Sequence, residues 1–152
     1  MKLVRATAAE CEAMAAAHAQ AFEAKAWRED EFEDLLEGEG IYGFLADDDA
    51  PLGLILCRIA ADEVEILTVG VMLAARRRGV ALALMLAALD IAREAGVAGA
   101  FLEVAVDNDA AINLYELMGF ERTGLRKSYY DRGPEGFTDA LVMRLDLNAA
   151  AA

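Results

Sequence analysis

A hairpin followed directly by a strand, a long helix and another strand is the feature that most constrains how this chain can fold. The hairpin joins two largely apolar runs through an Asp-rich turn, and the long apolar helix is closed by Gly96. We expect the hairpin strands at residues 41–46 and 52–59, the next strand at 63–71, the helix at 79–95 and the last strand at 100–106. Because a hairpin is antiparallel and a strand–helix–strand crossover is parallel, the sheet must be mixed.

The remaining segments place further helices near the N-terminus and further strands at the end. Thr7 and Glu10 have the spacing of a capping box, which predicts a helix from there to about Ala24. Further helices are expected at 27–37 and 109–118, and further strands at 2–6, 120–130 and 137–147. We therefore predict one α/β (α+β) domain over residues 1–148, with a mixed, mostly antiparallel sheet of six to seven strands flanked by about four helices. The alanine tail at 149–152 is expected to be disordered.

Composition excludes several classes of function. With 152 residues the chain has room for one ordinary domain, and 14 Lys and Arg against 27 Asp and Glu give a net charge of −13. Such acidity argues against nucleic-acid binding, which needs a basic surface, and suits a basic protein or peptide partner. It is also common in solvated surfaces that bind no partner.

Membrane, targeting and metal signals are missing from the sequence. The longest apolar stretch, residues 80–89, is about half of a membrane-spanning helix, and the first residues do not resemble a signal peptide. Cys11 and Cys57 fit no metal spacing, and His18 is the single histidine, so we expect neither a metal site nor a disulfide framework. We expect a cytoplasmic protein, a monomer or weak dimer, that binds neither nucleic acid nor a membrane.

A basic turn between a strand and the long helix predicts an anion site. Arg76, Arg77 and Arg78 precede Gly79 at the start of this helix, in a chain that is otherwise strongly acidic. A helix N-terminus presents unpaired N–H groups and the positive end of the helix dipole, both of which favour an anionic ligand. The turn has neither the Gly-Lys-Ser/Thr of a Walker loop nor the three glycines of a Rossmann fingerprint. The alternative is a basic helix start that is simply solvated.

Two motifs resemble those of the N-acetyltransferase superfamily known as GNAT. Residues 76–81 have the form Arg-x-x-Gly-x-Ala after a strand, which resembles the acetyl-CoA-binding motif of that superfamily. Residues 108–120 are similar to its Asn-x-x-Ala-x-x-Leu-Tyr-x-x-x-Gly-Phe pattern. Residues 101–104, the pair 129–130 and residues 139–143 resemble the RimI branch, which acetylates the N-terminal alanine of a small-subunit ribosomal protein.

The chain also departs from the family pattern at several positions. Met72 and Leu73 stand where the family often has Asp-Pro, Arg76 replaces its usual Gln, and Ala81 replaces a Gly. Val106 and Asp107 stand where the RimI branch usually has an Arg and a Ser nearby. The last pair lies near the expected acceptor side.

The resemblance implies how acetyl-CoA would be held. In the family, the strand end at residues 69–71 pairs with the pantetheine arm through its backbone, the amides at 77–82 bind the pyrophosphate, and Asn108 contacts the end of the pantetheine. The residues expected to bind acetyl-CoA are therefore Val69, Gly70, Val71, Arg76, Arg77, Arg78, Gly79, Val80, Ala81, Leu82 and Asn108.

Glu103 and Tyr115 are the candidate catalytic residues. Glu103 lies in an otherwise apolar strand, where desolvation would raise the pKa of its carboxyl and suit it as a general base. The alternative is an edge residue that faces solvent. By its position in the family motif, Tyr115 would be the general acid that protonates the leaving CoA thiolate; otherwise it packs in the core. Because the family mechanism is a direct attack, Cys11 and Cys57 are not expected to act as nucleophiles.

The acceptor side is predicted from aromatic and acidic residues. Trp27, Tyr129 and Tyr130 are expected to line the acceptor groove, although aromatic residues of this kind often serve ordinary packing. The second helix has an acidic face that either meets a basic peptide or is simply solvated: Glu31, Glu33, Asp34 and Glu37. His18, on an apolar stripe, is expected to be a packed core residue.

The resemblance implies an enzyme that transfers an acetyl group from acetyl-CoA to an amine. The expected acceptor is the N-terminal alanine of a ribosomal protein. One alternative is an acetyltransferase of the same fold that acts on a small-molecule amine or a lysine side chain. Another is a CoA-binding regulatory module without turnover, which the presence of both Glu103 and Tyr115 disfavours.

Overall fold

The chain folds around one seven-stranded mixed sheet, as its hairpins and crossover predict. The computed structural model describes residues 1–22 and 26–148, so the expected end of the first helix at Ala24 and the expected disorder at 149–152 lie outside the described residues. The strands are β1 (Lys2–Arg5), β2 (Ile41–Asp47), β3 (Pro51–Ala60), β4 (Glu63–Val71), β5 (Gly99–Ala105), β6 (Glu121–Asp131) and β7 (Phe137–Asp146). Their order is β1-β2-β3-β4-β5-β7-β6, and every neighbouring pair is antiparallel except β4 with β5.

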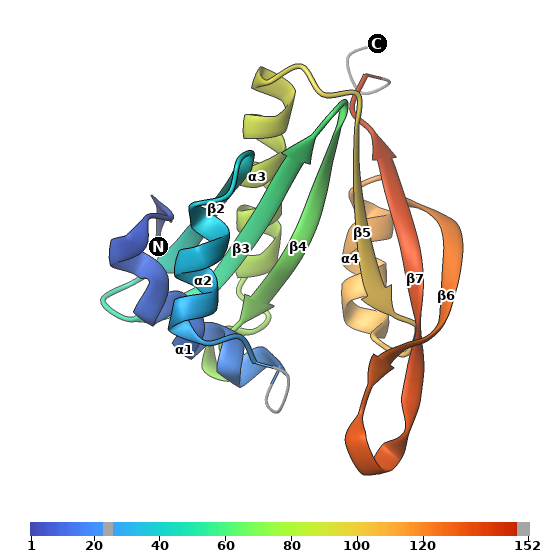
Figure 1. Cartoon of the computed structure of the whole chain (residues 1–152), viewed down its shortest axis with the longest axis horizontal. Helices are drawn as coiled ribbons and strands as arrows, with labels where there is room; N and C mark the ends of the chain where they lie inside the picture. The colour runs from blue at the N-terminus through green and yellow to red at the C-terminus, as the bar shows by residue number, and fades with distance from the viewer. Residues whose placement is uncertain (23–25, 149–152) are drawn as a thin grey trace.

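Two helices cover each face of the sheet (Figure 1). The helices α1 (Cys11–Phe22) and α2 (Glu29–Leu36) lie on one face, and α3 (Val80–Glu94) and α4 (Asp109–Leu117) lie on the other. Each face of the sheet has its own hydrophobic core, and alternate residues of β3 belong to one core or the other. Leu54 and Leu56 pack with α1 and α2, while Ile55 and Cys57 pack with α3 and α4. This explains why the strand reads as a continuous apolar run.

Local capping signals set where the first two helices begin. The predicted capping box is present: the Thr7 amide donates to Glu10 Oε1 at 2.7 Å, and the Ala9 amide donates to Thr7 Oγ1 at 3.3 Å. The second helix starts two residues later than predicted, at Glu29. Its cap is Arg28, whose backbone is extended and whose amide donates to Glu31 Oε1 at 3.1 Å.

The parallel strands β4 and β5 separate partway along their length, and this separation creates the site. They pair only from Glu63 with Gly99 to Ile66 with Leu102. Beyond that point the strands diverge into a V, which Figure 1 shows opening away from the shared end. The last five residues of β4 and the last three of β5 therefore turn unpaired backbone edges toward each other.

The final hairpin extends one side of this opening. The strands β6 and β7 form a long ribbon whose tip projects past the rest of the sheet (Figure 1). A 3₁₀ turn at Gly133–Glu135 makes the tip, as the glycine-rich sequence there predicts for a turn. Within the described residues, no helix is long and apolar enough to span a membrane, and no group of His, Cys, Asp or Glu is arranged to hold a metal ion.

Candidate active site

The turn before α3 has the backbone geometry of an anion cradle. Arg77 has φ +65° and Gly79 has φ +78°, both in the left-handed region. A side chain at Gly79 would meet no other atom, so its conformation rather than crowding accounts for the glycine. The Ala83 amide donates to the Gly79 carbonyl at 3.0 Å and starts the helix.

The N–H groups of this turn are free to meet a ligand. Among the described residues, the amides at 77–82 have no hydrogen-bond acceptor. The three arginines are exposed, and Arg78 alone has a carboxylate nearby, with its Nη2 3.8 Å from Asp48 Oδ2. The predicted helix start, free amides and positive charge are thus found together. That they bind an anion stays a prediction.

The unpaired edge of β4 leads from this turn into the opening. Gly70 and Val71 pair with β3 on one side, so their other side faces the gap toward β5. A Cβ atom at Gly70 would lie 2.9 Å from the Ala21 Cβ and 3.1 Å from the Phe22 ring. Because Gly70 has no side chain, α1 packs directly on β4. This packing supports the strand whose free backbone edge faces the opening.

Glu103 lies on β5, one residue past the last pair with β4. Its side chain is 12% exposed, and its Oε1 lies 3.0 Å from the Nε of Arg126 on β6. The carboxylate is thus not isolated among apolar groups, as the strand pattern suggested, but is paired with a guanidinium. Sequence reasoning missed Arg126 because β7 lies between β5 and β6, so the contact skips a strand.

Tyr115 projects from α4 and is buried, with 6% of its surface exposed. Burial raises the pKa of its phenol to about 12, and the nearby Tyr130 phenol adds to this rise once it ionises. Its hydroxyl has no hydrogen-bond partner among the described residues, yet no buried side-chain oxygen there lacks a partner, so this hydroxyl keeps contact with solvent. A buried ring with an accessible, unpaired hydroxyl is the arrangement that a proton donor requires.

The β6 tyrosines complete this side of the opening. The rings of Tyr129 and Tyr130 meet edge to face, with centroids 5.1 Å apart, and the Arg126 guanidinium lies 5.3 Å from the Tyr129 centroid. A hydrogen bond to Glu103 raises the pKa of Tyr129, with burial and the Glu103 charge adding to the effect. Burial and the Glu103 charge raise the pKa of Tyr130 to about 12. The predicted catalytic pair and both tyrosines therefore interact electrostatically.

Asn108 and Asp107 occupy the turn from β5 to α4. The Asn108 side-chain oxygen accepts from the Ala111 amide at 3.3 Å and caps α4, so this residue positions the helix that carries Tyr115. Its predicted contact with pantetheine would fall to the remaining amide nitrogen. Asp107, a departure from the family pattern, makes two hydrogen bonds with Arg132 at the hairpin tip.

The opposite wall carries Trp27, which is held by His18. The Trp27 amide donates to His18 Nδ1 at 3.0 Å, and the two rings stack with centroids 4.9 Å apart. His18 is 2% exposed, and burial lowers its pKa to about 4, so it is a packed neutral histidine as predicted. A pocket of about 440 Å³ beside Trp27 is lined by Trp27, Glu31, Asp34, Leu35, Arg58 and Leu67.

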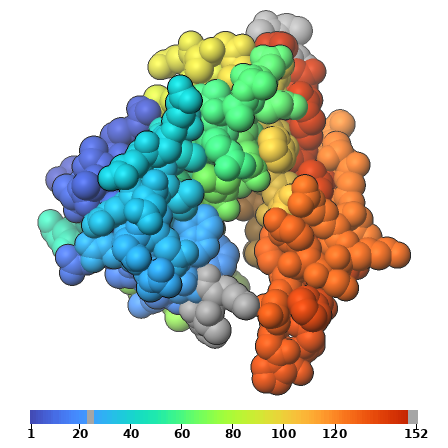
Figure 2. Space-filling model, in the orientation of Figure 1, coloured from blue at the N-terminus to red at the C-terminus, as the bar shows by residue number. Residues whose placement is uncertain are grey.

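Figure 2 shows the surface hollowed between the α1–α2 side and the β6–β7 side, with β4 and β5 between them. Trp27, Glu31 and Asp34 line a pocket together with Leu67 of β4. Tyr129 and Tyr130 lie near Glu103 of β5. Arg58, which also lines the pocket beside Trp27, pairs with Glu65 at 2.6 Å. The structure thus places Trp27 beside β4 and the two tyrosines beside Glu103 of β5, and that these residues bind an acceptor stays a prediction.

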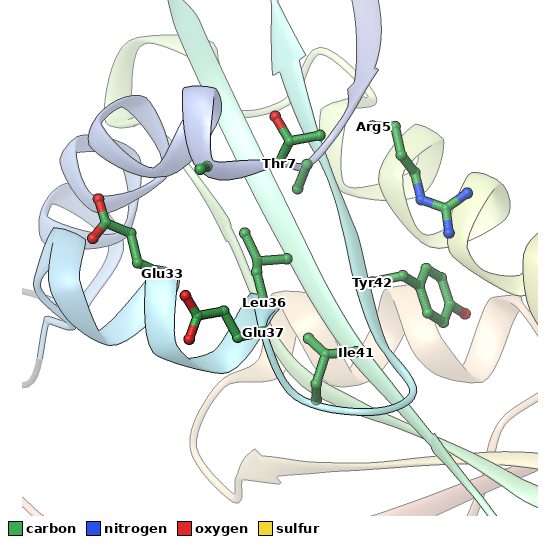
Figure 3. Close-up of a pocket in the computed structure, with 9 residues that line it drawn as sticks. Arg5, Thr7, Glu33, Leu36, Glu37, Ile41 and Tyr42 are labelled. Atoms are coloured by element: carbon green, nitrogen blue, oxygen red, sulfur yellow. The ribbon is translucent and has the colours of Figure 1, made fainter.

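A larger cavity lies elsewhere, at the edge of the sheet. It has a volume of about 570 Å³ and is lined by residues of β1, α2 and β2 and the turn after β1 (Figure 3). The Arg5 guanidinium lies 5.3 Å from the Tyr42 ring, and the Tyr42 hydroxyl donates to the Ala88 carbonyl at 2.7 Å. Glu33 and Glu37 face this cavity rather than the hollow beside Trp27. The predicted acidic face is therefore divided between two pockets.

Comparison with known proteins decides the family. The sequence model described as "Acetyltransferase (GNAT) family" matches residues 7–120, three quarters of the chain. The chain belongs to the GNAT acetyltransferase family. The match begins at the capping box and ends at Phe120, so it includes both motifs that carried the resemblance.

Similarity to two curated relatives places the chain in the RimI branch of the family. The N-alpha-acetyltransferase RimI of Mycobacterium tuberculosis is 45% identical over 84 residues, which are 55% of this chain and 49% of that protein. The ribosomal protein bS18-alanine N-acetyltransferase of Salmonella typhimurium is 32% identical over 104 residues, which are 68% of this chain and 70% of that protein. The matched part spans about half the length of the mycobacterial relative.

A solved GNAT structure supports the same branch. The crystal structure of the ribosomal-protein-S18-alanine N-acetyltransferase from Escherichia coli aligns with a TM-score of 0.87 and 27% identity, over 96% of this chain and 93% of that chain. The predicted family and branch, the mixed α/β fold and the assignment to N-acetyltransferases are thereby confirmed. The roles of individual site residues stay predictions.

Proposed function

We propose that this chain transfers the acetyl group of acetyl-CoA to the N-terminal amine of a protein, with the N-terminal alanine of a ribosomal protein as the acceptor. The observation that carries the proposal is the opening between β4 and β5, with Glu103, Tyr115 and the β6 tyrosines along one side. The similarity to the ribosomal-protein-alanine N-acetyltransferases of Salmonella and Escherichia supports the choice of acceptor.

The residues present fit acetyl-CoA along the opening. The free amides at 77–82 and the arginines at 76–78 would hold its phosphates, because hydrogen-bond donors and positive charge meet there. The unpaired backbone edge of β4 at residues 69–71 would bind the amide groups of the pantetheine arm. When bound, acetyl-CoA supplies a thioester whose carbonyl carbon the acceptor amine attacks, with the CoA thiol as leaving group.

Glu103 would take a proton from the acceptor ammonium. An α-amino group has a pKa of about 8, so its deprotonation near neutral pH is a modest task for a carboxylate, directly or through water. Arg126, whose Nε lies 3.0 Å from Glu103 Oε1, orients the carboxylate, and the Tyr129 hydroxyl is a hydrogen-bond donor beside it. The carboxylate would also attract the positively charged amine into the site.

Tyr115 would donate a hydrogen bond to the leaving sulfur. A phenol whose pKa is about 12 is protonated at neutral pH and so is always a donor. A thiol has a pKa of about 8.5, so complete transfer from Tyr115 to a free thiolate would cost about 5 kcal/mol. Its contribution is therefore greatest as a hydrogen bond that stabilises the developing negative charge on sulfur.

A panel of acceptors tests the activity. The purified chain is incubated with acetyl-CoA and one of three amines: a basic peptide that begins with Ala-Arg, the same peptide with a blocked N-terminus and an internal lysine, or spermidine. Mass spectrometry locates the acetyl group. We expect acetylation of the free α-amine. Turnover on spermidine or lysine alone would assign a different substrate class, and CoA binding without any turnover would assign a regulatory module.

A substitution tests the role of the carboxylate in the same assay. We expect Glu103→Gln to lower kcat about 100-fold, the usual scale of general base catalysis, without changing the KM for acetyl-CoA. Glu121→Gln makes the same chemical change at an exposed position on β6 and serves as the control. An unchanged kcat in Glu103→Gln would remove this residue from the mechanism.

A further inference from the structure

The tip of the β6–β7 hairpin is tied to the rest of the molecule by a two-point contact. Arg132 Nη1 donates to Asp107 Oδ2 at 2.7 Å, and its Nη2 donates to Asp107 Oδ1 at 2.8 Å. The hydrogen bond from Arg132 lowers the pKa of Asp107, which is therefore charged at neutral pH. A bidentate guanidinium–carboxylate pair fixes orientation as well as distance.

The part of the hairpin toward the tip extends beyond the pairing of β7 with β5, which ends at Ala140. The strand β6 is at the edge of the sheet, and Tyr130 is the only one of its 11 residues that is not exposed. Its register with β7 shifts between Arg126 and Tyr130, where Ser128 has φ +53° and its amide donates to Asp139 Oδ1 at 2.7 Å. The turn at Gly133–Glu135 buries no residue.

The two ends of the contact lie next to predicted site residues. Asp107 directly precedes Asn108, which caps the helix that carries Tyr115. Arg132 follows Tyr130 by two residues, and its charge acts on that phenol. Tyr130 in turn lies close enough to Tyr115 for ionisation of either phenol to affect the other. The contact between the two segments therefore fixes the tyrosine-bearing wall relative to α4.

We propose that Asp107 and Arg132 are a positioning pair that adapts this site to extended peptide acceptors. This inference rests on the proposed acetyl transfer and adds a determinant of acceptor choice. A small amine needs only the space beside Glu103, whereas the residues that follow a peptide N-terminus must lie against the walls of the hollow. The pair holds one of these walls, so its loss affects the binding of peptides and leaves small amines and acetyl-CoA unaffected.

A set of four variants tests the pair: Asp107→Ala, Arg132→Ala, the double alanine variant, and the exchange Asp107→Arg with Arg132→Asp. We expect each single variant to raise the KM for the Ala-Arg peptide about fivefold, within the range that an exposed bidentate pair supports, with kcat within about twofold. The double variant should be no worse than either single one, because both remove the same contact. The exchange should restore the KM to within about twofold.

A matched ion pair provides the control. Arg122 contacts Glu116 at 3.2 Å and also joins β6 to α4, but at the other end of the strand. Arg122→Ala should leave the KM for the peptide unchanged. An unchanged KM in Asp107→Ala, additive effects in the double variant, or an equal rise in the KM for spermidine or acetyl-CoA would each overturn the proposal.

Hydrogen exchange separates failure of this inference from failure of the proposed function. We expect Asp107→Ala to speed amide exchange across residues 126–137 at least fivefold, with exchange in α3 unchanged. This measurement needs no substrate. If the wild-type chain acetylates no peptide, the proposed function fails, whatever exchange shows. If peptides are acetylated and exchange at 126–137 does not change, the pair does not position the hairpin.

Discussion

Replacing Tyr115 by Phe separates catalysis from stability at a single buried position. The Tyr115 ring packs in the core with its centroid 6.0 Å from that of Phe120, and Phe preserves this packing. The hydroxyl has no hydrogen-bond partner among the described residues, so its removal breaks no protein–protein hydrogen bond. We expect the free energy of unfolding to change by less than about 1 kcal/mol, because no hydrogen bond within the protein is lost.

The expected effect on the rate is much larger. A hydrogen bond to a charged group contributes about 1.5–3 kcal/mol, so losing the donor to the leaving sulfur should lower kcat roughly 10- to 150-fold. Because the phenol has a pKa of about 12, it is protonated throughout the usual assay range. The wild-type rate should therefore show no loss from ionisation of Tyr115 between pH 7 and about pH 10.

Tyr42→Phe is the matched control. The Tyr42 hydroxyl makes a hydrogen bond within the protein, whereas that of Tyr115 has no partner among the described residues. The Tyr42 hydroxyl donates to the Ala88 carbonyl at 2.7 Å in the core. This variant should lose about 1 kcal/mol of stability and keep its kcat. Release of CoA thiol measured spectrophotometrically gives kcat, and urea unfolding gives stability. Wild-type turnover in Tyr115→Phe, or a stability loss like that of Tyr42→Phe, would refute the assignment of a free proton donor.

Two further predictions concern the anion site and the buried histidine. Arg77→Glu should raise the KM for acetyl-CoA about tenfold, and the effect should be weaker at high salt. Arg93→Glu, in the last turn of α3, is the control and should leave this KM unchanged. Equal effects of the two variants would argue against a local phosphate site. Because burial lowers the pKa of His18 from 6.5 to about 4, its neutral form contributes stability above pH 6.5 that is lost as the pH falls toward 4. The loss should be about 3 kcal/mol by urea unfolding and should be absent in His18→Phe, and an equally steep acid dependence in that variant would exclude His18 as the cause.

The sequence was sufficient to predict the features that depend on local order. The hairpin and the following crossover required a mixed sheet, and the alternation of apolar residues along β3 serves two cores. Thr7 and Glu10 marked the first helix because a capping box involves only three or four consecutive residues. The start of α3 at Val80, one residue after Gly79, followed for the same reason. Each of these features is decided within one element or between neighbours in the chain.

The features that escaped prediction depend on contacts between strands that are not neighbours. Arg126 reaches Glu103 across β7, and the register shift that turns Tyr130 inward is stabilised by Asp139 on β7. The separation of β4 from β5 also has no signature in the sequence pattern. It begins where the register of β4 with β3 shifts, since Cys57 pairs with Ile66 but Leu56 pairs with Thr68. Sequence patterning therefore located the reactive residues but not the groups that orient them.

Two sets of arginines in this acidic chain differ in their partners. In the C-terminal half, Arg144, Arg126 and Arg132 each join a carboxylate on another element. Arg144 closes the narrow end of the V by contacting Glu63 across β5, and a side chain at Gly99 would collide with both partners.

The second set lies at the start of α3. Within the described residues, neither Arg76 nor Arg77 has a carboxylate partner, although Asp and Glu outnumber Lys and Arg by 27 to 14. Carboxylates attract nearby guanidinium groups, so two arginines without such a partner are unexpected in an acidic chain. Together with the free amides beside them, they support the predicted site for an anionic ligand. In a chain of net charge −13 this difference is notable: Arg126, Arg132 and Arg144 each hold a carboxylate, whereas Arg76 and Arg77 are predicted to bind the phosphates of acetyl-CoA.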